Sequence, residues 1–134
     1  MITLSMAHIV TEDVPKLAQF YEALLEAPAI GSEEYVAIRT RGATLAICSQ
    51  CAFDVYGLYG AGETSMASPG SNRSVILDFE VDDVDAHRRR LDLVVGAFVV
   101  EPTTQPWGNR SMLFRDPDGN LINFFTVTHE RHSH

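Results

Sequence analysis

Long apolar runs, cysteine and positive charge are all scarce in this sequence. The apolar stretches run only a few residues, and the start, 1–4, has neither a basic residue nor an extended apolar core, so we expect no membrane span and no secretory signal. The two cysteines, Cys48 and Cys51, favour a reducing cytoplasm over a disulfide scaffold. Ten basic against 18 acidic residues give a net charge of −8, which disfavours nucleic-acid binding and allows a neutral or cationic ligand.

What is present predicts one globular domain made of two similar halves. The chain has 134 residues, of which 46% are hydrophobic, enough for a single core. Periodicity and turn residues predict strand, helix and strands in each half, on either side of a Gly- and Ser-rich linker at 60–72. The expected strands are 3–10, 35–40, 43–49, 74–81, 97–101, 110–115 and 121–127, and the expected helices are 14–27 and 84–95.

The order of elements repeats, and a shift of 70 residues brings the halves into register. This shift places Asp13-Val14 on Asp83-Val84, at the start of each helix, and His8 on Asp78 in the strand before it. We interpret the repeat as two copies of one supersecondary unit.

The motifs of this repeat resemble those of the vicinal-oxygen-chelate superfamily, which includes glyoxalase, bleomycin-resistance proteins and extradiol dioxygenases. The most specific part is Trp107-Gly108-Asn109-Arg110, followed by the strand, Asp-Pro-Asp-Gly-Asn turn and strand of 110–125. The resemblance also covers 9–21 and 75–84. It implies an α+β fold of two βαβββ modules that wall a cup for a ligand, and it implies that a homodimer is common.

The resemblance also implies four strand positions that hold a divalent metal in the enzymes of this superfamily. Here they fall on Met6, Ala46, Ile76 and Asn123. Two of these side chains are hydrocarbon, one is a thioether and one is a neutral amide, which is a poor donor set for such an ion. We therefore expect no metal and no cofactor at these positions.

A shift of two residues keeps the same face of each strand and gives a second set of side chains. It consists of His8, Cys48, Asp78 and Phe125, of which the first three could hold a transition metal. Alternatively, His8 and Asp78 form a buried hydrogen-bonded pair and Cys48 is a small core residue. In a third interpretation, His8 is a catalytic general base that Asp78 orients.

Aromatic side chains near the ends of strands are candidates for the ligand-binding rim. They are Phe53, Tyr56, Tyr59 and Trp107, together with Phe125. They could stack on a planar ligand, and the four outside the last strand could equally form a small satellite core. Arg110 and Asn123 are further ligand-binding candidates, although an ordinary salt bridge also explains Arg110.

These observations together predict a single domain over 1–134, with modules at 1–59 and 73–128, a linker at 60–72 and a tail at 129–134. The first functional hypothesis is a cytoplasmic, homodimeric protein that binds a small organic molecule without a metal, for example to sequester an antibiotic or a toxic metabolite. The alternatives are a metal-dependent lyase, isomerase or dioxygenase that uses His8, Cys48 and Asp78, and a metal-free acid–base enzyme that uses His8 and Asp78.

Overall fold

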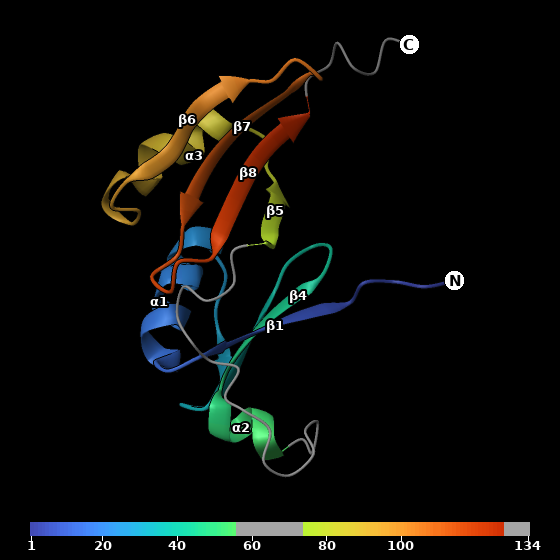
Figure 1. Ribbon diagram of the computed structural model, residues 1–134, viewed down its shortest axis with the longest axis vertical. Helices are drawn as coiled ribbons and strands as arrows, with labels where there is room; N and C mark the ends of the chain where they lie inside the picture. Colours follow the sequence, from blue (N-terminus) through green and yellow to red (C-terminus); the bar gives the residue numbers. More distant parts are fainter. Residues whose placement is uncertain (56–73, 128–134) are drawn as a thin grey trace. The chain divides into compact units, whose positions relative to one another are not determined.

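The computed structural model describes residues 1–55 and 74–127. The chain divides into two compact units, Met1–Ser71 and Asn72–His134. Each unit has a four-stranded mixed sheet and at least one helix (Figure 1), so the expected α+β fold of two modules is confirmed. None of the helices in the described residues is long and apolar enough to cross a membrane. The predicted linker and tail, and the candidates Tyr56 and Tyr59, lie outside the described residues.

The first unit contains sheet A, with the strand order β1-β4-β3-β2. Strand β1 pairs in parallel with β4, while β4 with β3 and β3 with β2 are antiparallel. The elements are β1 (Met6–Thr11), α1 (Val14–Leu25), β2 (Ile30–Gly31), β3 (Tyr35–Arg39), β4 (Thr44–Ser49) and α2 (Gln50–Val55).

Helix α1 forms where the sequence predicts it and covers one face of sheet A. The Asp13 carboxylate accepts a hydrogen bond from the Lys16 amide at 3.1 Å and so caps the first turn. Leu17, Tyr21 and Leu24 recur at helical spacing and are fully buried, and the helix contacts β3 and β4. Each such side chain stabilises the fold by about 1.5–3 kcal/mol.

Two short elements of the first unit are absent from the sequence prediction. Strand β2 has two residues and gives no periodic signal, and it completes the βαβββ order that the resemblance implies. Helix α2 follows β4 directly, because the Ser49 hydroxyl accepts a hydrogen bond from the Ala52 amide at 3.1 Å and caps the new turn.

The second unit repeats this plan in sheet B, with the strand order β5-β8-β7-β6. Strand β5 is parallel to β8, and β8 with β7 and β7 with β6 are antiparallel. The elements are β5 (Ile76–Glu80), α3 (Val84–Arg90), the 3-10 turn η1 (Leu91–Leu93), β6 (Phe98–Thr104), β7 (Asn109–Arg115) and β8 (Leu121–Val127). The helix predicted to run on to Gly96 therefore ends at Arg90.

The core of the second unit lies between α3 and one face of sheet B. Phe114 and Phe124 are almost fully buried, and their ring centroids are 5.4 Å apart. The His87 ring of α3 meets the Phe124 ring edge-on at 5.5 Å, which places α3 on this face. The Asp83 carboxylate caps α3 through the Ala86 amide at 3.1 Å, as the Asp13 carboxylate caps α1.

The turn between β7 and β8 is organised by one buried carboxylate. Asp116 Oδ1 accepts hydrogen bonds from the amides of Asp118 and Asn120, both at 2.9 Å, and Oδ2 accepts one from Asn120 Nδ2 at 2.8 Å. Gly119 adopts a φ of 91°, which glycine tolerates best. The predicted turn at 116–119 is therefore confirmed.

Candidate functional site

Five of the sequence-predicted candidates lie on sheet faces that do not pack against α1 or α3: His8, Cys48, Asp78, Asn123 and Phe125. In sheet A this is the face opposite α1, and in sheet B it is the face opposite α3. The register pairs His8 with Ala46 in the first unit and Asp78 with Asn123 in the second. The two halves of the chain therefore correspond in space as the sequence repeat predicts.

On the face opposite α1, His8 is hydrogen-bonded to Tyr35. His8 Nε2 lies 2.9 Å from Tyr35 Oη, and the ring centroids are 5.7 Å apart. The two residues belong to β1 and β3, which flank β4, so the pair reaches over the central strand. Ala46 and Cys48 of β4 lie on the same face and are fully buried. Their small side chains leave room for this contact.

Tyr35 is the functional candidate that the sequence prediction lacks. Its hydroxyl also donates to the Met6 sulfur at 3.8 Å, so one oxygen touches both Met6 and His8. A signal was present, because the predicted hairpin and the period of two along a strand place Tyr35 on the same face as Cys48. Periodicity does not show that the Tyr35 side chain reaches over β4 to contact His8 on β1.

Cys48 is a reduced, fully buried thiol. Burial raises the pKa of this thiol above its ordinary value, because a thiolate loses solvation in the interior. At neutral pH the side chain is therefore a neutral thiol, while Cys51 in α2 is exposed.

On the face opposite α3, Asp78 pairs with Asn123. Asn123 Nδ2 donates to Asp78 Oδ1 at 2.9 Å. The side-chain oxygen of Asn123 exposes less than 1 Å² and has no hydrogen-bond partner among the described residues. A buried acceptor without a donor costs free energy, so a group that donates a hydrogen bond here would be favoured.

His8 and Asp78 belong to different units, and each has a hydrogen-bond partner within its own unit. Their proposed pairing therefore stays a prediction. In the parts of the chain at 1–55 and 74–127, no three His, Cys, Asp or Glu side chains gather into a group that could hold a metal ion.

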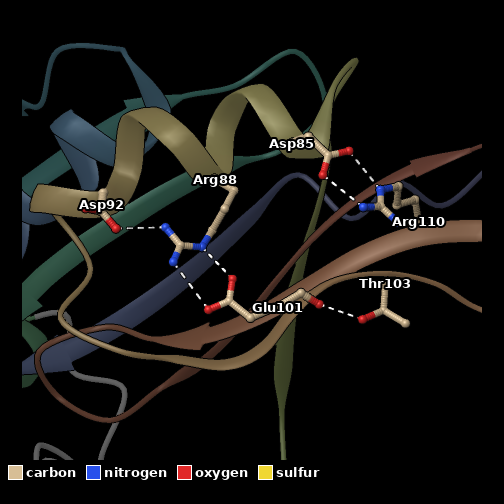
Figure 2. Close-up of polar contacts among 6 residues, drawn as sticks. All are labelled: Asp85, Arg88, Asp92, Glu101, Thr103 and Arg110. Atoms are coloured by element: carbon tan, nitrogen blue, oxygen red, sulfur yellow. Dashed lines mark hydrogen bonds and ion pairs between the residues drawn. The ribbon is translucent and has the colours of Figure 1, made fainter.

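Arg110 lies on the opposite side of sheet B from Asn123, toward α3. Figure 2 shows its guanidinium facing Asp85 of α3, with Nε and Nη2 at 2.8 and 2.9 Å from the two carboxylate oxygens. The hydrogen bond from Arg110 holds the pKa of Asp85 below its ordinary value. The structure thus supports the salt bridge that the sequence offers as the alternative to ligand binding.

A second ion-pair cluster lies beside the first (Figure 2). Arg88 donates to Glu101 at 2.6 Å and to Asp92 at 3.0 Å, and its guanidinium carbon lies 3.9 Å from the Phe98 ring centroid. The hydrogen bond from Arg88 holds the pKa of Glu101 below its ordinary value. These partly exposed pairs fasten α3 to the sheet and explain the charged helix as a structural feature.

The remaining candidates fall at several places. Trp107 precedes β7 and its side chain is 63% exposed. Phe125 is half-buried on the face opposite α3, where it pairs with Glu80 and Ser111. Phe53 lies in α2.

The side chains at the implied metal positions do not fit a divalent ion of the usual kind. The Met6 thioether touches Tyr35, Ala46 is fully buried, and the Asn123 amide uses its nitrogen on Asp78. Hard and borderline divalent ions prefer carboxylate and imidazole donors. This donor set supports no chemistry through such a metal.

Comparisons with known proteins agree with this fold. Residues 3–124 match the model of the Glyoxalase/Bleomycin resistance protein/Dioxygenase superfamily, so the chain belongs to that superfamily. Similar solved structures include a glyoxalase/bleomycin resistance protein/dioxygenase family enzyme from Burkholderia phytofirmans PsJN, with 19% identity, a TM-score of 0.76 and coverage of 95% of this chain and 100% of that one.

A glyoxalase/bleomycin resistance protein/dioxygenase from Nocardioides has 21% identity and a TM-score of 0.75, and the match covers 96% of this chain and 85% of that one. A glyoxalase-related enzyme from Fulvimarina pelagi has 18% identity and a TM-score of 0.75, with 94% and 88% covered. No curated protein matches the chain significantly. At these identities, the likeness to the solved structures shows the fold alone.

Proposed function

We propose that this protein binds a small organic molecule on a sheet face that does not pack against a helix, without the divalent metal site of its superfamily. One observation carries the proposal: the implied metal positions are occupied by Met6, Ala46, Ile76 and Asn123, which are poor donors for a divalent ion. The polar groups on the same faces bond to each other. Sequestration of an antibiotic or a toxic metabolite would be one use of such a site.

Each face offers its own means of holding a ligand. In the first unit the His8 ring and the Tyr35 hydroxyl can each donate or accept a hydrogen bond. In the second unit, Phe125 supplies an aromatic surface and Asn123 supplies an acceptor without a partner. Affinity would come from apolar burial at about 25 cal/mol per Å², with these polar groups setting the orientation.

A fragment titration with metal analysis tests this function. Isotope-labelled protein, purified without chelators, is titrated with phenol, benzamide and benzylamine while the side-chain signals of His8, Tyr35 and Asn123 are followed. We expect saturable shifts that persist in a chelating buffer, and less than a tenth of an equivalent of divalent metal in the purified protein.

Two variants separate binding from folding. Tyr35→Phe should weaken phenol binding severalfold and leave the amide spectrum of the second unit unchanged. Leu93→Ala serves as a control at an exposed apolar side chain that is not a ligand-binding candidate. Near-stoichiometric divalent metal that disappears in Asn123→Ala would contradict the proposal.

The His8–Tyr35 hydrogen bond favours metal-free acid–base catalysis as a second candidate function. When Tyr35 donates to the Met6 sulfur, His8 must donate through Nε2, which leaves Nδ1 as the basic nitrogen. A neutral imidazole with a free ring nitrogen can act as a general base. Within the first unit Tyr35 would orient His8, while the pairing of His8 with Asp78 stays a prediction.

A carbonyl and epoxide panel tests this second function. Turnover should survive chelation and fall at least a hundredfold in His8→Gln. Substrate binding without turnover in any member of the panel would reject catalysis and leave the binding function intact.

We also propose a cytoplasmic homodimer, which the reduced thiols and the superfamily support. Sedimentation equilibrium on the full chain should give twice the monomer mass, and a concentration-independent monomer would contradict it.

A further inference from the structure

We propose that Met6 and His8 form a binding site for a soft monovalent metal ion, copper(I) or silver(I), on the face of sheet A opposite α1. The site shares Met6 with the implied metal positions and His8 with the proposed ligand-binding face, but it would take a soft monovalent ion in place of a divalent metal or an organic molecule. Copper(I) and similar soft ions accept both thioether and imidazole donors. Hard divalent ions bind a thioether poorly and combine imidazole with other donors.

The first support is the placement of the donors. Met6 and His8 are two residues apart on β1, so their side chains leave the same face of the strand. Met6 is 40% exposed and His8 is also exposed, so an ion can reach both. An unbranched, exposed methionine can reorient at low cost.

The second support is that the two donor atoms converge on one point. Tyr35 Oη lies 2.9 Å from His8 Nε2 and 3.8 Å from Met6 Sδ. Metal–nitrogen and metal–sulfur bonds are about 2.0–2.3 Å long. An ion at the position of the Tyr35 hydroxyl would therefore require His8 Nε2 to move by about 1 Å and Met6 Sδ by about 1.5 Å.

The third support is the surface beneath the pair. Ala46 is paired with His8, and Cys48 is two residues further along β4 on the same face. Both are small, so nothing bulky on the central strand fills the space under the donors.

Silver(I) is the probe, because it needs no reductant. Silver nitrate is titrated in a chloride-free buffer into the full chain carrying Cys51→Ser, since the exposed Cys51 thiol would otherwise take the ion first. Methionine methyl and histidine ring signals are followed by NMR. We expect the first equivalent to shift the Met6 methyl and the His8 ring together, before Met1 and before the three histidines at 129–134 respond.

Two substitutions make the site falsifiable. Met6→Leu should weaken the first binding step at least tenfold, with an unchanged amide spectrum elsewhere as evidence of folding. Tyr35→Phe removes the competing hydroxyl and should leave affinity equal or raise it severalfold, whereas a merely structural role of Tyr35 predicts a loss.

Three results would each overturn the proposal. They are equal responses of Met1 and Met6 to silver, an unchanged silver affinity in Met6→Leu, and a large loss of silver affinity in a folded Tyr35→Phe. The organic fragments are titrated without silver, so failure of this site and failure of the proposed function are read from different experiments. A silver response confined to Cys48 would also reject the Met6–His8 site.

Discussion

Replacing Asn123 by leucine should stabilise the second unit, although it removes a hydrogen bond. The asparagine oxygen is buried without a partner among the described residues, and such an acceptor costs about 1–3 kcal/mol. The lost bond from Nδ2 ends on Asp78, whose carboxylate is exposed and can bind water instead, so its loss costs about 0.5–1 kcal/mol. The net gain is about 1 kcal/mol.

Urea unfolding followed by Trp107 fluorescence measures this change. Trp107 is the single tryptophan and belongs to the second unit, so the signal reports the unit that contains Asn123. A gain of about 1 kcal/mol corresponds to a rise in the melting temperature of roughly 3–5 °C for a chain of this size.

A double-mutant cycle supplies the control. Asp78→Ala alone should cost at most about 1 kcal/mol, and in the Asn123→Leu background it should cost almost nothing, because the partner is already gone. Destabilisation of Asn123→Leu by more than 1 kcal/mol would refute the reasoning, since it would mean that the hydrogen bond outweighs the unpaired oxygen. A stabilised variant that no longer binds benzylamine would indicate that Asn123 has a role in binding at the expense of stability.

Two further predictions concern local structure. Gly31→Ala should destabilise the first unit by about 1–3 kcal/mol, because φ is +152° and an added Cβ would meet the Tyr35 carbonyl oxygen. Gly42→Ala is the control and should be nearly neutral in thermal unfolding, because a Cβ added at Gly42 meets nothing within 4 Å. Asp85→Asn should lower stability at pH 7 but not at pH 2. Arg110 lowers the folded-state pKa of Asp85, so the stabilisation by this ion pair is present above the unfolded-state pKa of about 3.9. It is lost as the pH falls through the folded-state pKa. Equal stabilities of wild type and variant at pH 7 would show that the exposed pair contributes nothing.

Much of the fold follows from local signals in the sequence. Asp13 and Asp83 mark the helix starts, and the Asp116 turn forms as its residues predict, because each signal acts through hydrogen bonds to neighbouring backbone amides. The end of α3 was predicted less well. Leu91 is fully buried in a 3-10 turn, so the apolar spacing continues after the α-helix has ended.

The candidate site depended on contacts that local patterns do not encode. The repeat related His8 to Asp78, and the resemblance related Ala46 to Asn123; in the structure His8 pairs with Ala46 and Asp78 with Asn123, because the register of a sheet follows from the order and spacing of its strands. The partner of His8 within its unit depends on side-chain lengths on three strands, and no spacing rule gives that information. Tyr35 was therefore missed.

The same register leads to different chemistry in the two units because the central strands differ in side-chain size. In sheet B, the Asn123 side chain reaches the neighbouring strand, so Asp78 finds its partner directly opposite. In sheet A, Ala46 stands opposite His8 and is too short to reach it. His8 must find a partner beyond β4, and Tyr35 is long enough to provide it. The short side chain at position 46 thus accounts for the contact of His8 with Tyr35 across β4 and for the Met6, His8 and Tyr35 cluster on this face.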